Sequence, residues 1–112
     1  MKDCVFCKII KGQLPAKKIF EDENFLAFND ISPKANTHIL VIPKKHISKI
    51  SDCQDSDQNL IGGLILTAKK IAAKKNIKGY KLLFNVDKEG GQVVFHIHLH
   101  LLAGKKINLE QC

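Results

Sequence analysis

Three of the five histidines in the chain alternate with apolar residues, at His96, His98 and His100. Side chains on a β-strand alternate between its two faces, so a strand here would place all three imidazoles on one side. Imidazole titrates near neutral pH and can act as acid, base, nucleophile or metal ligand. Buried imidazoles need hydrogen-bond partners, and three in strict alternation exceed what packing requires. The pattern therefore predicts the functional site.

A glycine-rich loop, Gly90-Gly91-Gln92, leads directly into this segment. Glycine lets the main chain approach a phosphate closely, and N–H groups turned inward bind anions. Glycine pairs also form ordinary hairpin turns, but beside three histidines this pair favours a phosphate site. A neutral histidine suits attack on phosphorus, because water can later break the phospho-imidazole bond. No Asp or Glu occurs between residues 93 and 102, so a backbone carbonyl or another imidazole is expected to fix the nucleophile's tautomer.

The elements that must position these residues can be predicted from periodicity and turn residues. Residues 4–11 are predicted to form a short helix that ends at Gly12. Residues 57–76 have the apolar spacing of a long amphipathic helix, with Asp55 or Ser56 as its N-cap. Its Gly62-Gly63 pair permits close packing against a neighbour. Five strands are predicted at residues 17–21, 25–29, 38–43, 81–86 and 94–103. The expected class is α+β, a five-stranded antiparallel sheet with one long and one short helix in a single domain, residues 1–112.

Composition limits the classes of partner. The chain has 112 residues and a net charge of +7 that comes from lysine alone, because it contains no arginine. Arginine is the preferred residue for bidentate phosphate and base contacts, and the lysines are spread along the chain. We therefore expect a solvated surface that attracts anionic ligands rather than a specific nucleic-acid site. The sequence shows neither a membrane span nor a signal peptide, which predicts a cytoplasmic protein with reduced thiols.

Two cysteines near the N-terminus, Cys4 and Cys7, form a C-x-x-C pair. This spacing suits two ligands of a tetrahedral zinc ion. Two small core residues on a short helix would give the same pattern, so the residues alone leave both interpretations open.

Several motifs together resemble the histidine triad (HIT) family. They are the sequences ISP at 31–33, TH at 37–38, VIPKKHI at 41–47, GGQ at 90–92 and the histidine row. The chain is most similar to the Hint branch of nucleoside phosphoramidate hydrolases, once described as protein kinase C inhibitors. The resemblance extends from about residue 5 to residue 104. It implies a HIT-like fold and a homodimer in which two sheets form one of ten strands.

The resemblance also implies roles for individual residues. His98 is the expected nucleophile, His100 holds the phosphate, His38 lies near the leaving group, and His96 completes the catalytic set. Asp30 would accept hydrogen bonds from the ribose, although it could equally shape the turn before Pro33. An apolar slot for the purine is also implied, although its residues could equally be plain core: Phe6, Ile9, Phe28 and Ile31. Contacts to the phosphate or the ribose are implied for Asn85, Gly91, Gln92 and Val93.

In some bacterial members of the family a cysteine pair of this kind is completed by two histidines. The matching positions here are His46, after Pro-Lys-Lys, and His96. The resemblance thus implies a closed, structural zinc site of Cys4, Cys7, His46 and His96, with no cofactor for catalysis.

The chain departs from the Hint pattern at two places. Val93 stands where Hint-type enzymes commonly have a serine whose hydroxyl faces the phosphate or leaving group. The tail at residues 105–112 lacks the tryptophan-proline ending of many Hint proteins. Both differences bear on the rate and the choice of substrate.

The activity expected from the resemblance is cleavage of the P–N bond of purine nucleoside 5′-phosphoramidates, such as AMP joined to an amine or a lysine. The short length and the PKKHI sequence favour it over a diadenosine polyphosphate hydrolase of a sister branch. Two other interpretations remain open. One is a catalytic zinc held by the H-x-H pair and His38, and the other is a nucleotide-binding protein without catalysis.

Overall fold

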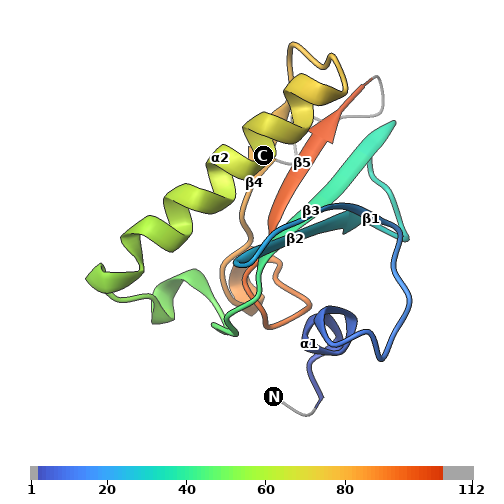
Figure 1. Ribbon diagram of the computed structural model, residues 1–112. Helices are drawn as coiled ribbons and strands as arrows, with labels where there is room; N and C mark the ends of the chain where they lie inside the picture. The colour runs from blue at the N-terminus through green and yellow to red at the C-terminus, as the bar shows by residue number, and fades with distance from the viewer. Residues whose placement is uncertain (1–2, 105–112) are drawn as a thin grey trace.

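The computed structural model describes residues 3–104, which form one antiparallel sheet and two α-helices (Figure 1). The sheet has the strand order β1-β2-β3-β5-β4. It contains five strands, which confirms the predicted α+β class: β1 (Lys18–Glu21), β2 (Phe25–Asn29), β3 (Thr37–Pro43), β4 (Lys81–Leu83) and β5 (Leu99–Ala103).

One face of the sheet is covered by helix α2 (Gln58–Lys74), which runs along it in Figure 1. Strand residues alternate between faces, and one apolar set from β2, β3 and β5 packs against Leu64, Ala68 and Ile71 of the helix. Gly63 lies against the ring of Phe25, where a Cβ atom would come within 2.4 Å of the ring. The predicted close packing of the glycine pair is therefore confirmed at Gly63.

The opposite face carries the short helix α1 (Val5–Ile10) and a second apolar cluster. Phe6 and Ile9 of the helix pack on Leu26, Phe28 and Leu40 of the strands. The helix ends as predicted, because Gly12 adopts a φ of +77° and its N–H donates to the carbonyl of Ile9. The helix covers only part of this face, and a cleft lined by His38, His98 and His100 lies beside it.

Several sequence-based boundaries differ from the structure. The last strand begins at Leu99 rather than at residue 94, because the chain before it bends and the N–H of Ile97 donates to the carbonyl of Ile47. Strand β4 ends at Leu83 rather than at residue 86. Helix α2 has Asp57 as its N-cap, and a 3₁₀ turn at Asp55–Asp57 precedes it.

No helix among residues 3–104 is long and apolar enough to cross a membrane. The expectation about the tail at 105–112 falls outside the described residues.

Candidate functional site

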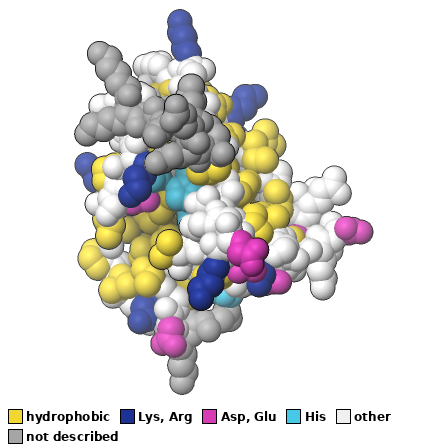
Figure 2. Space-filling view, turned by 180° about the vertical axis from the view of Figure 1, so that it is seen from behind, with side chains coloured by type: hydrophobic (Ala, Val, Ile, Leu, Met, Phe, Trp, Pro, Cys, Tyr) yellow, Lys and Arg dark blue, Asp and Glu magenta, His cyan; other side chains and the backbone are white. Residues whose placement is uncertain are grey.

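The open part of the sheet forms the floor of a cleft of about 770 Å³. Apolar side chains of α1 and β2 make one wall, and the histidines of β3 and β5 lie in its floor. Figure 2 shows imidazoles reaching the surface in a hollow, with hydrophobic side chains on one side of it. The cleft thus combines an apolar slot with a row of titratable groups, which suits a ligand with an aromatic part and a charged part.

His98 is held in one tautomer by the main chain. Its Nδ1 lies 2.8 Å from the carbonyl oxygen of His96, and a carbonyl can only accept, so Nδ1 carries the proton. The other nitrogen, Nε2, is then the one with a free lone pair. The side chain is almost fully buried and lines the cleft. The predicted backbone carbonyl therefore orients the candidate nucleophile.

His38 and His100 form a directed chain of hydrogen bonds. The backbone N–H of Lys34 donates to Nδ1 of His38 over 3.0 Å, so the proton of a neutral His38 lies on Nε2. This Nε2 lies 2.9 Å from Nδ1 of His100 and 3.4 Å from a carboxylate oxygen of Asp30. His100 Nδ1 must then accept, which leaves its proton on Nε2. The Asn85 amide nitrogen, 3.5 Å from Nε2, is itself a donor and does not accept this proton. His100 can therefore donate a hydrogen bond to an anion in the cleft.

The histidines of the cleft are neutral near pH 7. Burial lowers the pKa of His98, and the hydrogen bond to the His96 carbonyl opposes this only in part. Burial, together with neighbouring imidazoles, lowers the pKa of His100 to about 4. Burial also lowers the pKa of His38, against the opposing charge of Asp30. A neutral imidazole is the form that can act as a nucleophile.

Most of the residues predicted from the sequence meet in this cleft. Asp30 also shapes its loop, because Oδ1 accepts from the N–H of Ser32 over 2.7 Å. Ile31 and Val93 lie at the rim, with exposed fractions of 99% and 86%. The predicted residues that line the cleft are Phe6, Ile9, Phe28, Asp30, Ile31, His38, Asn85, Gly91, Val93, His98 and His100.

Two predicted residues lie elsewhere. The Gln92 side chain is buried and donates to the carbonyls of Ser48 and Val94, over 2.9 and 3.0 Å. It therefore holds the glycine loop in place rather than facing the cleft. His96 is fully buried and faces Cys4 rather than the cleft, although its ring and that of His98 both contact Phe6, with centroids 5.9 and 5.2 Å away. Of the row of three imidazoles, His98 and His100 therefore line the cleft, and His96 belongs to a second cluster.

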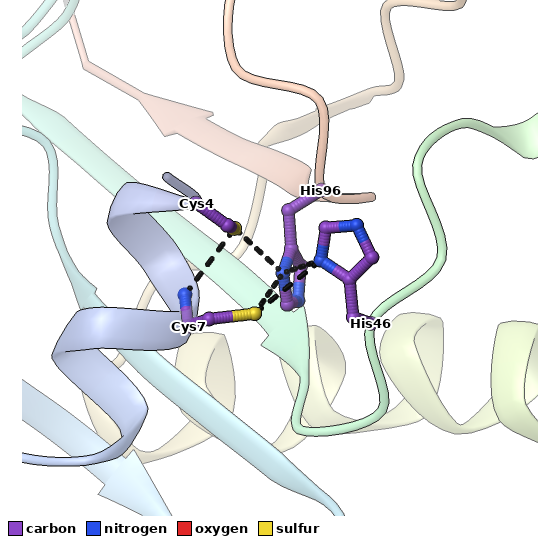
Figure 3. Close-up of side chains that lie close together, drawn as sticks. All are labelled: Cys4, Cys7, His46 and His96. Carbon is purple, nitrogen blue, oxygen red and sulfur yellow. Dashed lines mark hydrogen bonds between the residues drawn. The ribbon is translucent and has the colours of Figure 1, made fainter. Parts of the chain in front are cut away.

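A second cluster surrounds His96. Figure 3 shows Cys7 of α1 and Cys4, the N-cap of that helix, facing His46 and His96. Nδ1 of His96 lies 3.3 Å from Sγ of Cys4 and 3.6 Å from Sγ of Cys7, and Nδ1 of His46 lies 3.3 Å from Sγ of Cys7. The two Nδ1 atoms are 3.1 Å apart. All four ligand atoms lie within 4.8 Å of one another.

These distances fit tetrahedral zinc. Zinc–ligand bonds of ordinary length imply edges of about 3.3 Å between two nitrogens and about 3.6 Å between nitrogen and sulfur. His96 is also prepared as a ligand, because its Nε2–H donates to the carbonyl of Pro43 over 2.8 Å and leaves Nδ1 without a proton. The cluster could thus hold zinc in a closed site with four protein ligands.

Comparison with known proteins identifies relatives over almost the whole chain. The family model described as "Scavenger mRNA decapping enzyme C-term binding" matches residues 3–110. An uncharacterised HIT-like protein of Synechococcus elongatus is 43% identical over 107 residues, which are 95% of this chain and 94% of that protein. The chain belongs to the histidine triad (HIT) family.

Solved HIT structures have the same fold. A HIT family hydrolase from Legionella pneumophila is 49% identical, with a TM-score of 0.93 over 98% of this chain and 100% of that one. A zinc-bound histidine triad family protein from Mycobacterium smegmatis is 37% identical, with a TM-score of 0.83 over 93% of this chain and 76% of that one. The chain is thus similar to HIT hydrolases, and one HIT relative binds zinc.

Sequence reasoning missed three lysines of this HIT cleft. Lys17, Lys34 and Lys81 line it, whereas the lysines were expected to form a solvated surface. The available signal was the alternation along β4, which places Lys81, Leu83 and then Asn85 on the face of the cleft.

Proposed function

We propose that this HIT protein hydrolyses the P–N bond of purine nucleoside 5′-phosphoramidates through a covalent nucleotidyl-His98. The observation that carries the proposal is the fixed tautomer of His98, whose Nδ1–H is bonded to the His96 carbonyl. It leaves a neutral imidazole with a free Nε2 in a cleft that also has an apolar slot. Similarity to a HIT family hydrolase supports an enzymatic role.

In the first step, the lone pair of His98 Nε2 attacks phosphorus and forms an N–P bond. The P–N bond to the amine breaks, and the amine leaves with a proton taken from solvent. In the second step, water attacks phosphorus, the bond to His98 breaks, and the nucleoside monophosphate departs while the proton of the water passes to solvent. Each step keeps His98 in the same tautomer, because the His96 carbonyl holds Nδ1–H throughout.

The surroundings of His98 would support these steps. His100 Nε2–H can donate to a phosphate oxygen, because Nδ1 is taken by His38. Asn85 and the main chain at Gly91 line the same part of the cleft. Phe6, Ile9 and Phe28 would hold the purine, and Asp30 the ribose.

The test is steady-state hydrolysis of an adenosine 5′-phosphoramidate by the wild type and by His98→Asn, each with and without EDTA. We expect activity that resists EDTA and that falls by at least about 100-fold in the variant, because the nucleophile is lost. Circular dichroism checks that the variant is folded.

Other outcomes would favour the other functions. Faster turnover of a diadenosine polyphosphate would indicate the sister-branch hydrolase. Activity that EDTA abolishes while the ion of the Cys4, Cys7, His46 and His96 cluster stays bound would indicate a catalytic metal at Asp30, His38 and His100. The ligand atoms of these three residues also lie close together. Binding of AMP without any turnover would indicate a binding protein.

We further propose that Cys4, Cys7, His46 and His96 hold a structural zinc ion, and that the protein works in the cytoplasm. We also propose a homodimer in which β4, an edge strand of the sheet, pairs with its copy. Light scattering after size exclusion would then give twice the chain mass, and a monomer mass would contradict the dimer.

A further inference from the structure

The cleft carries positive charge from lysines that the proposed reaction does not use. Lys17, Lys34 and Lys81 line it, and among residues 3–104 Asp30 is the one acidic residue that does so. None of these three lysines takes part in the ion pairs found within that range. A cleft with surplus positive charge favours a ligand with more negative charge than one transferred phosphate carries.

The register of the sheet places Lys81 beside the strand positions of His38 and His100. It pairs with Leu102 of β5, and Leu102 also pairs with His38 of β3. His100 is opposite Leu83, so Lys81 is its diagonal neighbour, a relation that separates residues by about 7–8 Å. The flexible four-carbon stem of lysine can span such a gap. Lys34, by contrast, directs its ammonium to the carbonyl of Ser32, 3.3 Å away.

The strand order fixes which part of a substrate Lys81 would meet. The apolar slot lies over β2 and α1, and the triad residues His38 and His100 lie on β3 and β5. Lys81 lies on β4, the edge beyond β5. A substrate with its base over β2 and its phosphate at β5 can place its leaving group over β4, on the side of the phosphate away from the base.

We propose that the substrate's leaving group is anionic and that Lys81 is the specificity-determining residue that binds it. This inference rests on the proposed function and names its substrate class: nucleoside phosphoramidates whose amine carries a carboxylate or a phosphate. The bonds formed and broken are those of the proposed mechanism. Lys81 pairs with the second anionic group and orients the amine for departure.

The test uses two matched substrates, the adenosine 5′-phosphoramidates of glycine and of glycinamide, which differ in one carboxylate. We expect the wild type to prefer the glycine compound by about tenfold in kcat/KM, as for a hydrogen bond between charged groups. Lys81→Gln should lose this preference and Lys81→Arg should keep it. Because the same pair is compared between variants, the different basicity of the two amines cancels. The phosphoramidate of 2-aminoethyl phosphate distinguishes the sources: preference for it over the glycine compound assigns a phosphate, and the reverse assigns a carboxylate.

Lys70→Gln is the control, because it removes the same charge from an exposed position on α2. Equal loss of preference in Lys70→Gln would overturn the assignment to Lys81, since net charge alone would then explain it. A ratio of the two kcat/KM values that is the same in the wild type and in Lys81→Gln would overturn the inference while the proposed function stands. Absence of turnover for every phosphoramidate would overturn both.

Discussion

At the scale of single residues, two backbone groups determine which nitrogen of each cleft histidine carries the proton. The Lys34 N–H fixes His38, and the His96 carbonyl fixes His98. His100 takes its orientation from His38. The three imidazoles thus have assigned donors and acceptors without a buried carboxylate as the orienting group, in contrast to Ser-His-Asp sites.

The low pKa of His100 predicts a pH-dependent stability. Burial, with neighbouring imidazoles, holds this pKa at about 4 against an ordinary value of 6.5. Between these values the unfolded chain binds a proton that the native protein excludes, so the free energy of unfolding falls as pH falls from 6.5 toward 4. Urea unfolding across this range should show a smaller fall for His100→Asn than for the wild type. The contribution of His96 to this fall is the same in both proteins. Parallel curves of unfolding free energy against pH would contradict the prediction.

Val93 predicts a gain of function. Its side chain lies at the rim of the cleft with 86% exposure and cannot form a hydrogen bond. Val93→Ser adds a hydroxyl near the proposed phosphate position, and we expect kcat/KM for a phosphoramidate to rise by about tenfold. Stability should change by less than about 0.5 kcal/mol, because the site is exposed. An unchanged or lower kcat/KM would show that residue 93 does not contact the reacting group.

At the scale of the elements, helix α2 depends on one close contact with the sheet. A Cβ atom on Gly63 would lie 2.4 Å from the Phe25 ring, whereas one on Gly62 would meet nothing within 4 Å. We expect Gly63→Ala to destabilise the protein by about 1–3 kcal/mol through overpacking. Gly62→Ala should stabilise it by up to about 1 kcal/mol through helix propensity. Chemical denaturation of both variants measures the contrast, and equal effects would contradict it.

Periodicity predicted the strands and helices well where their side chains pack regularly on the two faces of the sheet. The alternation in β2 and β3 and the apolar spacing of α2 correspond to the two faces of the sheet. The sequence could not show that strand β5 begins at Leu99, because the alternation of apolar and polar residues already runs through residues 95–98. In the structure the N–H of Ile97 instead donates to the carbonyl of Ile47, in the loop after β3. The same long-range packing turned Gln92 toward Ser48 and His96 toward Cys4, which no local pattern indicates.

At the scale of the whole molecule, α1 joins the two sites. With its N-cap Cys4 it provides two thiols to the cluster, the second from Cys7, and it provides Phe6 and Ile9 to the wall of the cleft. Its six residues are too few for a helix that is stable alone. The cluster also holds His96, whose carbonyl orients His98. Metal binding at the cluster would therefore stabilise both the fold and the substrate slot.

Cys7→Ser tests this connection. We expect the variant to lose its zinc, from about one ion per chain, because a structural site needs four ligands. Its Tm should fall by at least about 5 °C, and KM should rise more than kcat falls. Elemental analysis, calorimetry and kinetics measure these effects. Cys53→Ser is the control, because Cys53 lies outside the cluster and its loss should leave the zinc content unchanged. A zinc-free wild type would contradict the prediction.

Residue 34 has a consequence for mutational tolerance. Its main chain donates to His38, while its side chain faces the cleft. Since every residue except proline has a backbone N–H, nineteen side chains can occupy this position without altering which nitrogen of His38 carries the proton. Substitution there can retune the charge that an incoming ligand meets and leave the protonation order of the triad intact. Proline alone would change the charge at the cleft and also remove the hydrogen bond to His38. Position 34 is therefore a place where related proteins can diverge in ligand preference.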